Sequence, residues 1–315
     1  MLLILDIINT LGITIGLTKG DNMRVWKAID IYLSSKAYCS LSSSSQKTYR
    51  YNLYKIQGTR IDGNKFGDKF INKMTPEIIN EAYDTWEAED STANANHLAT
   101  VLSVVMNHHI RLESIQKNPM KFLKRRSSKP RSVVWEHDQV MTFLDTAFSK
   151  FDWRNIGLIV YMCYEWGQRP VDIRNLTFSQ IDWYKRKVDI TQTKRGAEVE
   201  LPIPDELYPM LKQQETDWGF QDYVVPNHRA SDGSYRPLTV QQMTALLKEV
   251  KADCSLPENL QVGDLRKTAI VQMIKGGATP LAIQSASGHK NVVSLNPYNK
   301  FSLETAKSAL ERRQR

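Results

Sequence analysis

The segment GHKNVVSLNPYNK, residues 288–300, places Tyr298 nine residues after His289 and directly after a proline. A phenol has a pKa of about 10, so a tyrosine that attacks a substrate near neutral pH needs activation. If the substrate is a DNA phosphodiester, extra negative charge develops on the nonbridging oxygens in the transition state. Two arginines suit that charge, because the planar guanidinium group matches phosphate geometry. This chemistry therefore requires two arginines in rigid positions.

Two arginines do lie beside apolar helical segments. Arg169 occurs in EWGQRPVDIRNL, between an apolar run and the next expected helix, and Arg266 occurs in GDLRKTAIVQMIKGG, beside an apolar stripe. Arginine close to core helices is unusual unless it is paired. Two interpretations stay open: a phosphate clamp, or two structural salt bridges. The salt bridges would join Arg169 to Asp172 and Arg266 to Asp264.

The composition favours a nucleic-acid partner. The formal net charge is +8 and the isoelectric point is near 9.2, which favours a polyanion, with nucleic acid ahead of a membrane surface. The three cysteines are scattered and form no CxxC pair, so the sequence indicates neither a zinc site nor a disulfide framework, and a reducing, intracellular setting fits. No carboxylate cluster typical of magnesium sites is evident. We do not expect metal ligands among His97, His108 and His109.

The first part of the chain is expected to be helical. SLSSSSQKTYRYNLYKI starts with serines suited to capping, and TPEIINEAYDTWEAE starts with Thr75 as N-cap and Pro76 at the first helical position. The initial run MLLILDIINTLGITIGL lacks a basic region and is short for a membrane span, which needs about 20 apolar residues. It is either an extra packing element or a product of start-site choice. We favour the second interpretation, with Met23 opening the domain.

The second part mixes helices with short strands. NIGLIVYMCYEW is apolar on nearly all sides, which predicts a buried helix that ends at Gly167. KVDITQT and AEVELPIP alternate as strands do, and a turn at 194–196 joins them. Further helices are expected at about 239–250, 264–275 and 280–286. The predicted fold is mainly α, of the α+β kind, with a small antiparallel sheet.

A basic segment separates the two parts. Residues 114–135 contain seven Lys or Arg and no acid, which is typical of a linker that tracks phosphates, although a solvated charged loop is the alternative. The candidate DNA-binding residues are Lys121, Lys124, Arg125, Arg126, Lys129 and Arg131. The expected division of the chain is an extension at 1–22, a helical domain at 23–125, the linker at 126–134 and a second domain at 135–315.

Several motifs of the second part resemble those of the tyrosine recombinases, the phage integrase family. GQRPVDIRNLTFSQID resembles the first-arginine motif of the family, with Asp172 at its acidic position. TQTKRG resembles the hairpin motif and gives Lys194. GDLRKTAIVQMIKGGATPLAIQSASGH is similar to the second-arginine and Leu-Gly-His boxes and gives Arg266 and His289. Tyr298 falls at the position of the nucleophile.

The resemblance implies a role for each of these residues. Tyr298 would attack the phosphorus and form a 3′-phosphotyrosyl link, while Arg169 and Arg266 hold the nonbridging oxygens. Lys194 would protonate the departing 5′ oxygen as a general acid. His289 would bind the phosphate or help to remove the tyrosine proton. The acidic residue of the first motif, Asp172, would orient the arginine three positions before it.

The resemblance covers about 135–310, and MTPEIINEAYDTWEAEDSTANANHLATVLSVVMNHHIRLESIQKNP also resembles the helical core-binding domain of the family. It implies a site-specific recombinase that acts on double-stranded DNA without a metal or cofactor and without a membrane. In the family a C-terminal helix docks on a neighbouring protomer, which implies a homo-tetramer on DNA; packing of SLETAKSALE within its own chain is the alternative. A cytoplasmic protein encoded by a phage or a bacterium fits.

One position departs from the family pattern. The second-arginine box normally opens with histidine, and this chain has Gly263 there. Loss of one preorganised donor costs about 10²–10³ in rate. The enzyme could therefore be slower, use water or a neighbouring group instead, or be a DNA-binding relative without catalysis. A type IB topoisomerase activity is a further alternative. Ser287, where the family often has leucine, is interpreted as a minor change.

Overall fold

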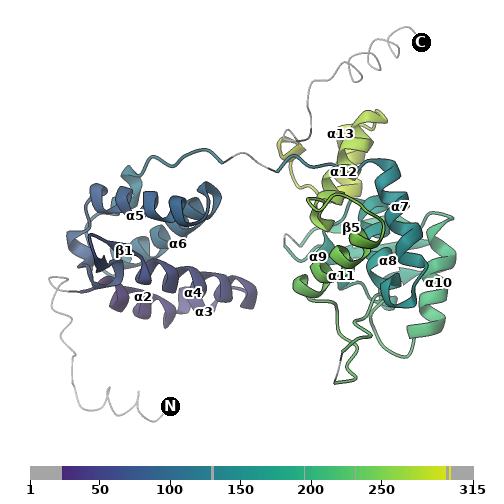
Figure 1. The fold of residues 1–315 in the computed structure, drawn as a ribbon, viewed down its shortest axis with the longest axis horizontal. Coiled ribbons are helices and arrows are strands. Elements are labelled where there is room, and N and C mark those ends of the chain that lie inside the picture. The colour runs from purple at the N-terminus through teal and green to yellow at the C-terminus, as the bar shows by residue number, and fades with distance from the viewer. Residues whose placement is uncertain (1–22, 129–130, 195, 231, 296–297, 299–315) are drawn as a thin grey trace, which may run out of the picture. The chain divides into compact units, whose positions relative to one another are not determined.

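The computed structural model describes residues 23–128, 131–194, 196–230, 232–295 and 298. The chain divides into two compact units, Met1–Pro130 and Arg131–Arg315 (Figure 1). The division falls inside the predicted basic linker. No helix among the described residues is long and apolar enough to cross a membrane.

Helices make up most of the first unit. Its helices are α2 (Val25–Leu33), α3 (Lys36–Cys39), α4 (Ser43–Gly58), α5 (Pro76–Glu89) and α6 (Thr92–Arg111). A short antiparallel hairpin of β1 (Arg60–Ile61) and β2 (Asn64–Lys65) follows α4. Hydroxyl side chains accept hydrogen bonds from free N–H groups at the starts of four helices, which explains where these helices begin. These N-caps are Ser35, Ser42, Thr75 and Ser91.

The core of the first unit lies between α4, α5 and α6. Leu98, Leu102 and Val105 of α6 are completely buried, as is Trp86 of α5, whose indole N–H donates to Thr59 Oγ1 at 2.8 Å. Burial of side chains this large stabilises the unit by about 1.5–3 kcal/mol each. A polar partner for the indole N–H removes the cost of burying it.

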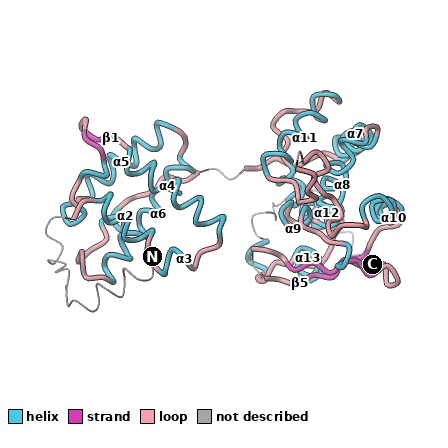
Figure 2. Tube along the Cα trace, turned by 90° about the horizontal axis from the view of Figure 1, so that it is seen from below, coloured by secondary structure: helices cyan, strands magenta, loops and turns pink. Residues whose placement is uncertain are grey.

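The second unit contains seven described helices and a three-stranded sheet. The helices are α7 (His137–Phe148), α8 (Phe151–Trp166), α9 (Pro170–Arg174), α10 (Leu207–Trp218), α11 (Val240–Asp253), α12 (Val262–Lys275) and α13 (Pro280–Ser287). The antiparallel sheet has the order β3 (Ile181–Asp182), β4 (Lys187–Thr191) and β5 (Glu198–Pro202). Strands are a small part of each unit (Figure 2). The predicted fold class, mainly α with a small antiparallel sheet, is confirmed.

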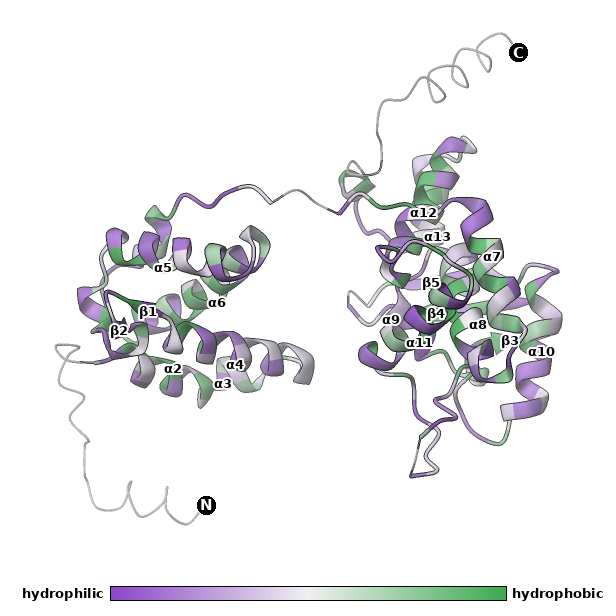
Figure 3. Cartoon of the chain, in the orientation of Figure 1, coloured by the Kyte–Doolittle hydropathy of each residue, from purple (hydrophilic) through white to green (hydrophobic). Residues whose placement is uncertain are grey.

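Helix α8 is the centre of the second unit. Its residues are buried on almost every side, and α7, α11 and α12 pack against it; Figure 3 shows the concentration of hydrophobic residues there. The helix ends at Gly167, which has a φ of 60° and therefore takes the left-handed conformation that glycine tolerates. Pro170 then starts α9, the helix expected after Arg169. The tight turn between the two helices holds Arg169 against the core.

The sheet follows the predicted alternation. In β4 the side chains of Val188 and Ile190 are buried, and in β5 those of Val199 and Leu201 are buried, while the intervening residues face solvent. Ile190 pairs with Val199 in the register. One face of the two strands thus packs on the core, and the turn that joins them lies at the surface.

Candidate active site

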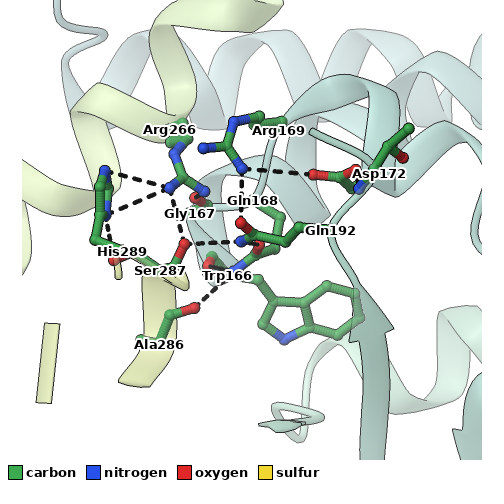
Figure 4. Close-up of polar contacts among 11 residues, drawn as sticks. Trp166, Gly167, Gln168, Arg169, Asp172, Gln192, Arg266, Ala286, Ser287 and His289 are labelled. Atoms are coloured by element: carbon green, nitrogen blue, oxygen red, sulfur yellow. Dashed lines mark hydrogen bonds and ion pairs between the residues drawn. The ribbon is translucent and has the colours of Figure 1, made fainter. Parts of the chain in front are cut away.

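Arg169 lies at the start of α9, and its side chain is one-fifth exposed. Its Nη1 donates to Gln192 Oε1 at 2.7 Å and lies 3.9 Å from Asp172 Oδ2 (Figure 4). The Arg169–Asp172 contact is thus a long one. The other carboxylate oxygen, Asp172 Oδ1, accepts from the backbone N–H of Thr193 at 2.8 Å. Asp172 therefore contacts both the first arginine and the turn that follows β4.

Arg266 projects from α12 and is only 7% exposed. Its Nη1 donates to the backbone oxygen of Gly167 at 3.1 Å, and its Nη2 donates to that of Ser287 at 2.8 Å. Backbone carbonyls thus neutralise part of the cost of burying this guanidinium group. The alternative that Arg266 pairs with Asp264 is wrong, because the described residues contain no ion pair between them, and the Asp264 carboxylate binds Arg131.

His289 follows α13 and lies against Arg266, with both ring nitrogens 3.4 Å from Nη2. The Ser287 hydroxyl lies 2.5 Å from the carbonyl oxygen of Ile283 and 2.6 Å from His289 Nδ1. A hydroxyl has one proton, and a carbonyl oxygen can only accept. Ser287 must therefore donate to Ile283 and accept from a protonated Nδ1. In a neutral His289 this assigns the proton to Nδ1 and leaves Nε2 as the acceptor.

Tyr298 lies beside this histidine. The ring centroids of His289 and Tyr298 are 6.0 Å apart, with an edge-on angle of 66°. The tyrosine ring also packs against a small apolar cluster that includes Ile270, Ile283 and Leu295. The backbone N–H of Tyr298 donates to the oxygen of Leu295 at 2.9 Å. These contacts bring the end of the described chain back onto α12 and α13.

Lys194 is exposed in the turn between β4 and β5. Two backbone hydrogen bonds close the base of this turn: Gln192 N–H donates to Ala197 O, and Gly196 N–H donates to Gln192 O, both at 2.8 Å. The base of the hairpin is thus held, while the side chain of Lys194 reaches into solvent. The arrangement brings two guanidinium groups, an imidazole and a phenol together, and the hairpin that follows β4 carries a third cation, Lys194.

The phage integrase family model matches residues 134–304, more than half of the chain. The chain belongs to the phage integrase family. It is therefore a tyrosine-type site-specific recombinase, an enzyme class that cuts and rejoins DNA. No curated protein matches the sequence.

Solved integrases share the fold of this family member. A lambda integrase dimer bound to a COC′ core site has 16% sequence identity and a TM-score of 0.72, over 96% of this chain and 84% of the other. The Tn1549 transposon integrase bound to a circular intermediate DNA has 17% identity and a TM-score of 0.74, over 92% and 99%. A lambda integrase tetramer bound to a Holliday junction has 15% identity and a TM-score of 0.73, over 90% and 79%.

The basic residues of this integrase-family chain have different surroundings. Lys121 and Lys124 are exposed, and Arg125 is exposed and donates to Thr100 Oγ1 at 2.8 Å. Arg126 pairs with Asp84 at 2.7 Å and also with Glu87. The acidic side chains raise the pKa of the Arg126 guanidinium, chiefly through the hydrogen bond to Asp84. Lys129 lies outside the described residues.

Arg131 is also engaged by an acid. It binds the Asp264 carboxylate with two hydrogen bonds, from Nε at 2.7 Å and from Nη2 at 2.8 Å. The hydrogen bond to Asp264 raises the pKa of Arg131. Lys267, on the same helix as Asp264, donates to the backbone oxygen of Arg131 at 3.1 Å. Arg131 thus anchors the start of the second unit along α12.

Sequence reasoning missed two polar residues of the site, Gln168 and Gln192. Both are completely buried, and they join Arg169 to the segment before His289 (Figure 4). The only available signal was position, since Gln168 directly precedes the first arginine and Gln192 stands two residues before Lys194. Among the residues that the structure describes, no three His, Cys, Asp or Glu side chains gather as a metal site would require.

Proposed function

We propose that this recombinase cleaves and rejoins double-stranded DNA with Tyr298 as the nucleophile. The observation that carries the proposal is the contact between the rings of Tyr298 and His289, beside Arg266. A phenol next to an imidazole whose Nε2 can accept a proton is a suitable nucleophile for phosphoryl transfer. The two guanidinium groups supply the charge that the transition state needs.

In the proposed reaction the Tyr298 oxygen forms a bond to the scissile phosphorus and gives its proton to His289 Nε2. The bond between the phosphorus and the 5′ oxygen breaks, and Lys194 gives a proton to that oxygen. Arg169 and Arg266 hold the nonbridging oxygens throughout. The product is a 3′-phosphotyrosyl link, which keeps the energy of the phosphodiester bond. Rejoining by a 5′ hydroxyl therefore needs no nucleotide cofactor or metal.

The exposed basic residues of the segment between the two units are proposed to contact DNA phosphates. Lys121, Lys124 and Arg125 are exposed and bear no ion pair to an acid in the part of the chain that the structure describes. Arg126 and Arg131 carry acidic partners, so their first role is to anchor the segment. Lys129 remains a candidate phosphate contact. These charges give an affinity for DNA that falls as salt rises.

The solved relatives bound to DNA, including the tetramer on a Holliday junction, support assembly of this chain as a homo-tetramer on DNA. The helix predicted at SLETAKSALE, which would join the protomers, lies outside the described residues. We also propose that the enzyme is cytoplasmic, where it meets the DNA that it recombines. Its origin from a phage or a bacterium is part of the same proposal. The predicted core-binding and catalytic domains remain proposals for the two units.

A nicked suicide substrate tests the reaction. Loss of the short 5′ fragment after cleavage traps the covalent adduct, so wild-type protein should give a protein–DNA band on a denaturing gel. Tyr298→Phe should give none, because phenylalanine has no oxygen to attack phosphorus. Tyr184→Phe is the matched control: Tyr184 is 96% exposed, and its substitution should leave the adduct unchanged. An adduct that persists in Tyr298→Phe would contradict the proposal.

A DNA-binding function without cleavage is the second candidate, and Gly263 favours it. Among the described residues, apart from the adjacent residues of its own helix, no atom lies within 4 Å of where a Cβ at Gly263 would sit, so the space next to this position is open. Site-specific binding by wild-type protein with no adduct on the suicide substrate would support this candidate. Relaxation of supercoiled plasmid without a cognate site would instead indicate a type IB topoisomerase activity.

A further inference from the structure

Gln192 contacts three parts of the site through one buried side chain. Its Oε1 accepts from Arg169 Nη1 at 2.7 Å. Its Nε2 donates to Gln168 Oε1 at 2.7 Å and to the backbone oxygen of Ser287 at 2.8 Å (Figure 4). Each hydrogen of the amide is therefore used, and the oxygen faces a cation. A side chain that is completely buried and fully satisfied in this way holds one orientation.

The partners of Gln192 fix that orientation. A flipped amide would turn its NH₂ group toward the Arg169 guanidinium and its oxygen toward two acceptors. Gln168 is held in turn, because its Nε2 donates to the oxygens of Trp166 and Ala286 at 3.1 and 2.6 Å. Gln168 Oε1 is thus left to accept from Gln192. The two amides form a closed network with no alternative pattern of hydrogen bonds.

Gly288 is packed directly against Gln192. Gly288 has a φ of 69°, and a Cβ at this position would lie 2.5 Å from Gln192 Nε2 and 2.8 Å from its Cδ. Such approaches are not possible for real side chains, so the amide occupies the space that only a glycine leaves open. The position of the chain just before His289 therefore depends on the position of Gln192.

The backbone of Gln192 also closes the base of the hairpin that carries Lys194, through Ala197 and Gly196. The residue after it, Thr193, is held by Asp172 at 2.8 Å. The hairpin is thus fastened at two consecutive residues, and motion of the turn has to start beyond Thr193. Displacement of Gln192 would move Lys194 relative to the arginine.

We propose that Gln192 is a positioning residue of this recombinase. It holds the Arg169 guanidinium in place and fixes the Lys194 hairpin against the His289 segment. The proposal rests on the function proposed above. Without the amide, Arg169 would be free to turn toward the Asp172 carboxylate, whose Oδ2 is buried and has no hydrogen-bond partner in the described part of the chain. The guanidinium would then lie away from the substrate phosphate.

Gln192→Met tests the proposal, because it keeps the length of the side chain and removes every polar contact. We expect the rate of adduct formation on the suicide substrate to fall about 100-fold, which is typical of a catalytic group misplaced by about 1 Å. The dissociation constant for uncleaved DNA should change less than about threefold, since the buried amide adds no charge for the DNA backbone. Gln213→Met is the matched control at an exposed helical position and should match wild type.

A substrate with an uncharged methylphosphonate at the scissile position separates positioning from general damage. Loss of the phosphate charge removes the main contribution of Arg169, so the defect of Gln192→Met relative to wild type should shrink to about tenfold or less on this substrate. A residue with only a structural role would give the same defect on both substrates, and that result would overturn the proposal. The comparison of two rates within one preparation does not depend on the fraction that is folded.

Gln192→Glu provides a second test if the methionine variant does not fold. It keeps an acceptor for Arg169 and loses both donors, so the carboxylate faces the oxygens of Gln168 and Ser287. We expect a smaller DNA-cleavage defect than in Gln192→Met, with the same partial recovery on the methylphosphonate. Wild-type rates in both variants would overturn the inference alone. Failure of the wild-type protein to form any adduct would overturn the proposed function, and the inference with it.

Discussion

The hydroxyl of Ser287 determines which nitrogen of His289 can act as a base. Because that hydroxyl donates to Ile283, it accepts from His289 Nδ1, and Nε2 is left to accept a proton. The histidine was predicted from the sequence, where Ser287 was interpreted as a minor change from leucine. The structure gives the serine a contact with the imidazole that leucine could not make.

Gly263 gives the first prediction at the scale of a residue. It lies in the first turn of α12, next to Val262, and lines a cavity of about 650 Å³ together with Pro170 and Val171. The cavity has room for an imidazole ring. We expect Gly263→His to raise the rate of adduct formation about tenfold or more, because it restores the hydrogen-bond donor that the family has at this position. The measurement is single-turnover cleavage of the suicide substrate.

Gly263→Ala is the control for this prediction. Alanine also raises the helix propensity of the position, by about 1 kcal/mol relative to glycine, but it adds no hydrogen-bond donor. Equal rates in the alanine and histidine variants would show that stability, and not a missing donor, limits the reaction. A rate unchanged from wild type in Gly263→His would mean that water or another group already performs this role.

At the scale of elements, the sequence predicted the parts with strong local signals. Ser42 and Thr75 mark the starts of α4 and α5, and Gly167 marks the end of α8. Helices α7 and α10 and strand β3 were not predicted. The buried face of α10 includes Gln214, whose amide hydrogen-bonds inside the core, so the apolar period is interrupted. The N-cap of α7 is Glu136, in place of the serine or threonine N-caps that signalled other helices.

The network around Gln192 could not be predicted for a different physical reason. Its partners come from positions far apart in the sequence, and buried amides give no periodic pattern. The same limit applies to Asp264. Its partner is Arg131, 133 residues away, and sequence proximity suggested Arg266 instead. Side-chain type and spacing predict which residues can do the chemistry, while tertiary contacts decide which of them pair.

Helix α6 gives a prediction about pH. His109 is completely buried on this helix and bonds to the oxygen of Ala28 in α2 at 2.9 Å. Burial lowers its pKa from 6.5, and burial also lowers that of His108. The unfolded chain therefore binds protons first as the pH falls through 6.5. The stabilisation from His109 is complete above that pH and is lost as the pH falls further, by up to about 1.4 kcal/mol per pH unit.

Hydrogen exchange of α6 amides between pH 7.5 and 5, corrected for intrinsic exchange rates, measures this loss. In His109→Gln the amide keeps a donor for Ala28 and does not titrate. As the pH falls, the free energy of opening of α6 should therefore decline less steeply in the variant than in wild type. Parallel pH profiles for the two proteins would show that His109 has no part in the acid sensitivity of the first unit.

At the scale of the whole molecule, acidic side chains engage two arginines inside the basic segment. Arg126 is tied to α5 through Asp84, and Arg131 is tied to α12 through Asp264. The net charge of +8 predicted a nucleic-acid partner, but the count of basic residues did not distinguish anchors from free charges. An arginine already paired with an acid neutralises less phosphate than an exposed, unpaired lysine does.

This difference can be measured as the salt dependence of DNA binding. Lys124→Ala should weaken binding uniformly across DNA sequences and reduce the slope of log affinity against log salt by about 1, because one phosphate contact is lost. The matched variant Arg126→Ala should leave that slope nearly unchanged, since its charge is already offset by Asp84 and Glu87. Equal reductions in the two variants would show that Arg126 leaves its acidic partners to bind DNA.

The most direct test of the account is the identity of the residue that becomes attached to DNA. Digestion of the trapped adduct with protease and nuclease, followed by tandem mass spectrometry, locates the nucleotide on the chain. We predict that the modified peptide contains Tyr298, with the nucleotide linked to its phenolic oxygen through a 3′ phosphate. A nucleotide on any other residue, or a 5′ phosphate link, would contradict the claim that this tyrosine attacks the phosphodiester.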